Sequence, residues 1–135
     1  MAERRPIVLI DGDLRQLPTG DTLPESGGGG ATAMVQTEIV ATAYSTVNGD
    51  FAGNVIRRMN NAATQTITVE PSMTGGQPVT FIRTGAGAVT FAAGTGVTIL
   101  SAGGNLSIAD QYGSATLVPD ATTANTYYLI GNLTA

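Results

Sequence analysis

The chain has 135 residues, of which only 12% are charged, and ten acidic residues against six basic ones give a net charge of −4. It contains no cysteine, histidine, tryptophan or lysine, which excludes a disulfide framework and leaves stability to packing or assembly. The six arginines are scattered, so we expect no binding to nucleic acid, because phosphate neutralisation needs clustered cations. A mean hydropathy of +0.15 predicts a globular chain, and so few charges suit a protein packed against copies of itself or other subunits.

This length accommodates one domain of about 100 residues plus an appendage. No segment approaches the ~18–20 consecutive apolar residues of a membrane span, and the apolar run near the N-terminus covers only Ile7 to Ile10. We therefore expect no membrane insertion and no signal peptide, and synthesis in the cytoplasm of the producing cell.

The first predicted element is a hairpin inside an N-terminal arm, residues 1–25. The β-branched run from Pro6 to Ile10 is followed by Asp11-Gly12, the dipeptide that favours a type I′ turn, and the return strand covers 13–17. A glycine-rich linker follows at 26–33, with the reach of a flexible coil. Because an isolated two-stranded hairpin is only marginally stable in water, the arm needs a surface to lie on.

The remaining residues, 34–135, are predicted to form an antiparallel β-sandwich with a jelly-roll-like arrangement. Short apolar or alternating runs recur about every ten residues with glycine-rich turns between them, which is the pattern of such domains. The clearest run places Ile67 and Val69 on one face and Thr66 and Thr68 on the other. A helix over 31–43 is the alternative there, but its threonines and Ile39-Val40 favour an extended chain. The expected strands are 38–44, 54–59, 64–70, 78–83, 88–91, 97–100, 106–109, 114–118 and 126–133.

Two motifs invite a ligand-binding interpretation that their context disfavours. Asp11-Gly12-Asp13 lacks the alternating oxygen ligands and distal glutamate of a calcium loop, so we interpret it as the hairpin turn. Gly85-Ala86-Gly87 is followed by the strand-like Val89-Thr90-Phe91 and not by the helix that a nucleotide site needs. We interpret it as a turn, and we expect no metal and no cofactor.

Catalysis at neutral pH has few candidate groups here, because histidine, cysteine and lysine are absent and carboxylates, tyrosines and metal-bound water remain. Asp50, Glu70, Asp110 and Asp120 stand singly at turns and strand ends. A glycosidase-type carboxylate pair stays open, since such a pair is made in space. Single acids at turns are usually solvated or hold the turn, so we expect no enzyme and no catalytic residue.

The tyrosines are the candidate ligand-binding side chains. Tyr112, Tyr127 and Tyr128 suggest an aromatic platform for a sugar, but neighbours in a strand point to opposite faces. Only one of Tyr127 and Tyr128 is therefore available to it, and core or interface packing is the alternative for all three. We single out Tyr112 and Tyr128 as candidate glycan-binding residues.

Two stretches together resemble structural proteins of tailed-bacteriophage virions. "PIVLIDGDLRQLPTGDTL" resembles a short module of such proteins, and "TITVEP", "VTFIRTGAGAVTFAAGTGVTILSAGG", "YGSATLV" and "YYLIGNL" resemble a β-domain of tail-fibre and head-decoration proteins. The stretches cover residues 6–23 and about 54–133. Where the family often has a tryptophan near the end of its last strand, this chain has Tyr127-Tyr128. The resemblance implies a turn at Asp11-Gly12, packing positions at Leu14, Leu17 and Leu23, turn glycines at 85, 87, 94 and 96, and a last strand closed by Gly131-Asn132-Leu133.

The resemblance implies a structural protein of the virion but does not by itself separate head from tail. The low charge, the few catalytic groups, a hairpin that needs a surface and the lack of coiled-coil or β-helical shaft sequence favour a capsid decoration, or cement, protein on the exterior of the virion. Its partners would be the major capsid protein and copies of itself, as a homotrimer, with no nucleic acid and no membrane. The arm would make the contacts, and its anchor residues would be Ile7, Leu9, Leu14, Leu17 and Leu23. The alternative is a small tail-fibre or tail-tip component that binds a host surface glycan.

Overall fold

The computed structural model divides the chain into two compact units, residues 1–31 and 32–135, and describes residues 7–10, 13–16 and 33–135. In the first unit, β1 (Ile7–Ile10) and β2 (Asp13–Gln16) pair antiparallel. Their register sets Leu9 opposite Leu14. The expected turn at 11–12, the packing positions Leu17 and Leu23, and the linker at 26–32 lie outside the described residues.

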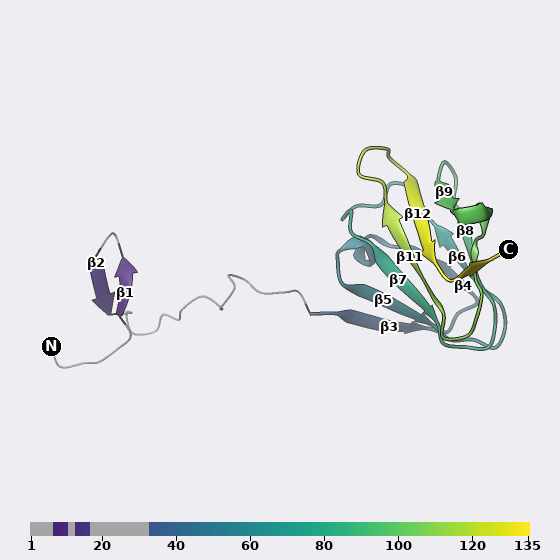
Figure 1. Cartoon of the computed structure of the whole chain (residues 1–135), viewed down its shortest axis with the longest axis horizontal. Coiled ribbons are helices and arrows are strands. Elements are labelled where there is room, and N and C mark those ends of the chain that lie inside the picture. The colour runs from purple at the N-terminus through teal and green to yellow at the C-terminus, as the bar shows by residue number, and fades with distance from the viewer. Residues whose placement is uncertain (1–6, 11–12, 17–32) are drawn as a thin grey trace. The chain divides into compact units, whose positions relative to one another are not determined.

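The second unit is a β-domain, as the composition and alternation predict (Figure 1). Its described helical segments are two short 3-10 turns, η1 (Asn48–Phe51) and η2 (Ala102–Gly104). One sheet has the order β3 (Val35–Ile39), β5 (Val55–Met59), β7 (Val79–Arg83), β11 (Ser114–Pro119), β12 (Thr126–Gly131) and β9 (Thr98–Ser101). The other has the order β13 (Leu133–Thr134), β10 (Ser107–Ile108), β8 (Val89–Ala93), β6 (Gln65–Val69) and β4 (Ala43–Ser45).

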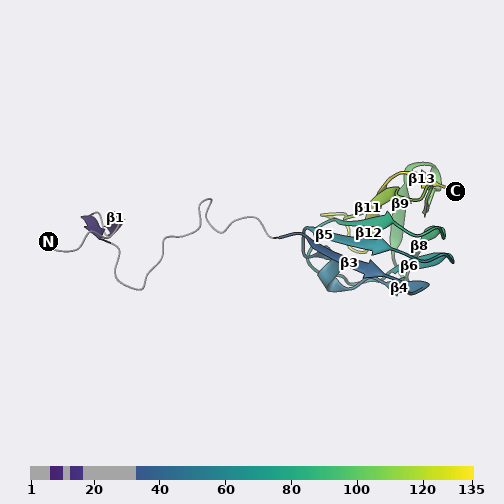
Figure 2. The ribbon, with the colours of Figure 1, turned by 90° about the horizontal axis from the view of Figure 1, so that it is seen from below.

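Strand pairing in the β-domain is mixed, so the expectation of a wholly antiparallel, jelly-roll-like domain is wrong. The pairs β3–β5, β5–β7, β4–β6, β6–β8 and β9–β12 are parallel. From β3 to β8 the chain alternates between the two sheets. Each time it returns to a sheet, the new strand lies beside the earlier one and runs in the same direction. Parallel pairing requires such a crossover connection. Figure 2 shows β4, β6 and β8 running side by side. Antiparallel pairing is restricted to β7–β11–β12 and β8–β10–β13.

The first crossing between the sheets breaks the strand expected at 38–44. Residues 40–42 form a bend between β3 and β4, and Asn61 Nδ2, from the crossing between β5 and β6, donates a hydrogen bond to Val40 O at 2.6 Å. The strand expected at 126–133 is also divided, because Asn132 separates β12 in one sheet from β13 in the other. Alternation of side chains does not reveal such crossings, since both halves remain extended.

Gly85 and Gly87 lie in the crossing from β7 to β8, where they pack against the backbone of the crossing from β5 to β6. A Cβ on Gly85 would lie 2.4 Å from Asn61 N, and one on Gly87 would lie 2.0 Å from Ala63 O. The same backbones are hydrogen-bonded, with Gly87 N donating to Asn61 O at 2.8 Å. The turn interpretation of this glycine motif is confirmed, and close approach explains its residue type.

One hydrophobic core lies between the two sheets. Phe81 of β7 and Phe91 of β8 meet edge to face with ring centroids 5.3 Å apart, and each is at most 1% exposed. On β6 the buried residues alternate as expected, with Ile67 and Val69 fully buried. Phe51 of η1 packs against Tyr127 of β12, which extends the core toward the groove described next.

Candidate functional site

A groove with a volume of about 460 Å³ lies beside β9 and β12. Three exposed apolar or aromatic side chains line it: Leu100, Tyr128 and Ile130. Leu100 and Tyr128 are register partners, and Ile130 follows Tyr128 by two residues, so it points to the same side of the strand. The other lining residues are Ser101, Ala102, Asn105, Leu129, Gly131 and Leu133, so none of the described residues that line the groove is charged.

The alternation of β12 positions Tyr128 at the surface. Tyr127 and Leu129 are 4% and 2% exposed, whereas Tyr128 and Ile130 are 40% and 60% exposed. Burial raises the pKa of Tyr127 above its ordinary value. Tyr127 therefore belongs to the core and Tyr128 is the one available to a ligand, as expected for neighbours in a strand.

Asp120 fixes the hydroxyl of Tyr128. Tyr128 Oη donates to Asp120 Oδ2 at 2.6 Å, and Asp120 Oδ1 accepts from Thr122 N at 2.7 Å, Thr122 Oγ1 at 2.9 Å and Thr123 N at 2.8 Å. These bonds, that of Tyr128 first, hold the pKa of Asp120 well below its usual range, and the contact with Asp120 raises the pKa of Tyr128. Asp120 therefore stays ionised and holds the phenol in one orientation.

Two polar groups at the groove have no protein partner. Among the described residues, the side-chain amide of Asn105 makes no hydrogen bond, although its backbone N donates to Ala102 O. Ser101 Oγ is buried and likewise has no hydrogen-bond partner within the described part of the chain. Ser101 Oγ faces the core side of β9, opposite to Leu100, so the groove combines an apolar, aromatic wall with one side-chain amide that the fold does not use.

Tyr112, the second candidate glycan-binding residue, lies elsewhere. It stands in the turn before β11, is 75% exposed and does not line the groove. Its backbone has a φ of 68°, and its N donates to Arg83 O of β7. Tyr128 lies beside Val118 near the other end of β11, so the structure does not bring the two tyrosines into one platform.

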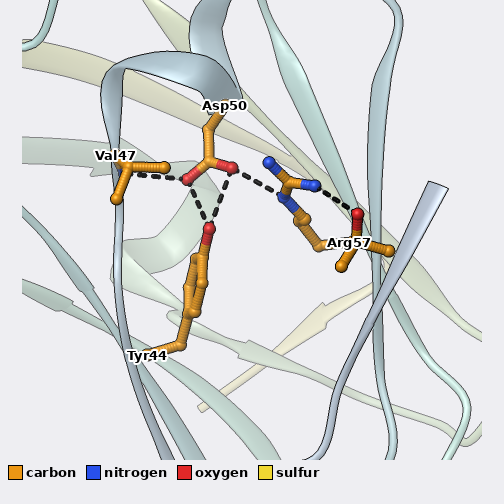
Figure 3. A network of polar contacts seen from close by, with 5 residues as sticks. Tyr44, Val47, Asp50 and Arg57 are labelled. Atoms are coloured by element: carbon orange, nitrogen blue, oxygen red, sulfur yellow. Dashed lines mark hydrogen bonds and ion pairs between the residues drawn. The ribbon is translucent and has the colours of Figure 1, made fainter. Parts of the chain in front are cut away.

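Asp50, which we expected as a turn residue, is completely buried in a polar network (Figure 3). Its carboxylate accepts from Tyr44 Oη at 2.8 and 2.9 Å, from Val47 N at 3.0 Å and from Arg57 Nε at 2.7 Å. Arg57 Nη1 donates in turn to Thr37 Oγ1 at 2.7 Å. The network joins β4 of one sheet to β5 and β3 of the other through η1, and its burial makes it a structural feature and not a ligand site.

The remaining acidic residues expected at turns contact residues more than twenty positions away in the chain. Asp110 Oδ2 accepts a hydrogen bond from Asn132 Nδ2 at 3.0 Å, and the backbone N of Glu70 donates one to Thr46 Oγ1 at 2.9 Å. Within residues 33–135 and the two arm strands, no three metal-ligating side chains gather into a potential metal site. None of the helical segments in the described part of the chain has the length and apolarity needed to cross a bilayer.

The anchor residues proposed for the arm are placed only by their backbone. Ile7 and Leu9 lie in β1 and Leu14 in β2, while Leu17 and Leu23 lie outside the described residues. Sequence reasoning missed Leu100, Asn105 and Ser101 as neighbours of Tyr128. Leu100 was visible as the end of an apolar run, but only the parallel pairing of β9 with β12 brings it to the tyrosine.

No protein-family model, no curated protein and no solved structure matches this chain.

Proposed function

We propose that this chain is a structural protein of a tailed-bacteriophage virion, and that it decorates the outside of the capsid and stabilises it. The observation that carries the proposal is the division into two compact units, one of which holds a hairpin of two four-residue strands. A hairpin of this size is only marginally stable alone in water, so it needs a partner surface. The resemblance of residues 6–23 and about 54–133 to phage virion proteins indicates the class of that partner.

In this proposal the arm, residues 1–25, anchors the protein on the major capsid protein or on a neighbouring copy. Ile7, Leu9 and Leu14 supply apolar contacts from the two strands, with Leu17 and Leu23 beyond them. The linker carries four consecutive glycines, and a flexible connection lets two weak contacts act together through their effective concentration. The β-domain then lies on the exterior as part of a homotrimer, without catalysis, cofactor, nucleic acid or membrane.

We also infer that the β-domain is best classed as a sandwich and not as a solenoid. In favour of this, a single core takes buried residues from both sheets. Within the β-domain, parallel pairing of each strand with the strand one turn earlier is found only from β3 to β8. The later strands β10 and β11 pair antiparallel with β8 and β7. They end the winding after three turns, where a solenoid would continue it.

The test uses capsids from which decoration proteins have been removed. Purified full-length protein should co-sediment with them, and a variant lacking residues 1–25 should stay in the supernatant. The truncated variant should keep the far-ultraviolet spectrum and cooperative unfolding of the β-domain, because the core cluster found among the described residues, including Ile39 and Tyr44 that pack against it, lies entirely in the part that is kept. Equal binding by both proteins would remove the anchor role from the arm, and failure of the full-length protein to bind would end the decoration proposal.

The alternative location is the tail, as a fibre or tail-tip component. Quantitative mass spectrometry of purified virions separates the two locations, because a decoration protein repeats over the whole capsid lattice and a tail component is present in few copies. Immunogold labelling of the head rather than the tail is the result that we expect.

A further inference from the structure

We propose that the groove beside β9 and β12 binds a neutral carbohydrate, with Tyr128 as the platform for a sugar ring. The inference goes beyond capsid decoration and does not depend on the arm. It rests on the combination of an oriented aromatic ring, apolar neighbours and the unused side-chain amide of Asn105 in one groove.

The apolar wall suits one face of a pyranose. A pyranose ring presents C–H groups on a face and hydroxyl groups around its edge, so it packs on a flat aromatic surface while its edge remains free to hydrogen-bond. Tyr128 offers such a surface, flanked by Leu100 and Ile130, which are 46% and 60% exposed. The volume of about 460 Å³ lies in the range of ordinary small-ligand sites, about 300–1,000 Å³.

The polar lining indicates a hydroxyl-rich and uncharged ligand. The amide of Asn105 offers both a donor and an acceptor to a ligand hydroxyl, and it makes no hydrogen bond within the described residues. Ser101 Oγ is buried and follows Leu100 directly in β9, so it faces the core side of the strand and not the ligand. Because none of the described residues that line the groove is charged, an acidic sugar or a phosphate has no counter-charge here.

Asp120 acts as a positioning residue for the platform. Its carboxylate holds Tyr128 Oη at 2.6 Å while three hydrogen bonds from Thr122 and Thr123 hold the carboxylate. A ring that is oriented before the ligand arrives loses little conformational freedom on binding, so more of the contact energy appears as affinity.

The experiment titrates the full-length, isotope-labelled chain with maltose, cellobiose, lactose and chitobiose in turn and follows backbone amide resonances. We expect at least one sugar to shift resonances confined to residues 98–105 and 126–133, with millimolar affinity. Tyr128→Ala should lower that affinity about tenfold or more. Tyr128→Phe keeps the ring and loses the bond to Asp120, so it should bind with an intermediate affinity while retaining the wild-type fold.

Tyr112→Ala is the matched control, because it removes another exposed tyrosine that does not line the groove. It should bind the sugar like the wild type, and Tyr128→Ala should still co-sediment with capsids, which keeps this inference separate from the anchor proposal. The absence of shifts with all four sugars would overturn the inference, as would equal losses in the two alanine variants. A change of sedimenting mass in Tyr128→Ala without any sugar-induced shift would overturn it too, and would assign the groove to contacts between copies.

Discussion

The β-domain contains two tyrosine–aspartate pairs with the same hydrogen-bond chemistry and opposite surroundings. Tyr44 Oη donates to Asp50 at 2.8 Å, and Tyr128 Oη donates to Asp120 at 2.6 Å. Asp50 is completely buried and is paired with Arg57, whereas Asp120 is only partly buried, directly before the exposed residues 121–124, and is held by Thr122 and Thr123.

The difference teaches that burial, more than the contact itself, decides what such a pair does. A buried carboxylate has lost its water, so every missing partner is costly, and the pair joins the two sheets. An exposed pair is screened by solvent and adds little to stability. Its effect is to orient Tyr128 at the edge of the groove, which matters for binding.

The largest expected effect tests the buried side of this comparison. Asp50→Asn keeps the shape and removes the charge opposite Arg57, whose side chain is only 11% exposed. The free energy of unfolding should fall by about 3–5 kcal/mol, the usual result of breaking a buried ion pair. Urea unfolding of the full-length chain measures this.

Asp120→Asn is the matched control for that substitution, because it makes the same chemical change in an exposed pair. It should unfold at nearly the wild-type urea concentration, as surface substitutions usually do. Equal destabilisation by the two variants would show that burial does not separate the pairs.

A smaller effect is expected from removing one hydroxyl. Tyr44→Phe leaves the edge-to-face contact with Phe81 in place, with ring centroids 6.4 Å apart, and removes the hydrogen bonds to Asp50. A hydrogen bond to a charged group contributes about 1.5–3 kcal/mol to stability. The variant should lose about this much free energy of unfolding, which lowers the midpoint temperature of its thermal unfolding. Tyr128→Phe makes the same change on the surface, and a comparable shift there would contradict the comparison.

Much of the strand content follows from local chemistry that the sequence displays. Alternation placed Ile67 and Val69 in the core, and the glycine motif at 85–87 marked a turn. The direction in which the strands pair could not be predicted from the sequence, because strands with parallel and with antiparallel neighbours show the same alternation of side chains. The crossing at 40–42 was hidden for the same reason, since its stabilising bond comes from Asn61, which is about twenty residues away in the chain.

The two aspartates show the same limit at the level of a site. Asn48-Gly49-Asp50 has the composition of a surface turn, and nothing local indicates that Tyr44 and Arg57 enclose the carboxylate. Tyr128 was singled out because neighbours in a strand face opposite sides. Its groove was not foreseen, because Leu100 and Asn105 reach it only through the pairing of β9 with β12.

The most gradual effect is expected at alkaline pH. Burial first, and then the bond to Asp50, raises the pKa of Tyr44 to about 12 from its ordinary value of 10.0. The folded state therefore favours the neutral phenol, and its contribution to stability is complete below pH 10 and is lost as the pH rises through 12. Spectrophotometric titration of tyrosinate should show a last step that is absent in Tyr44→Phe and present in Tyr128→Phe. The free energy of unfolding, measured with urea, should fall over the same pH range, and it should fall less steeply in Tyr44→Phe than in the wild type. Loss of the last step in Tyr128→Phe instead would mean that the exposed pair, and not the buried one, holds its proton more strongly.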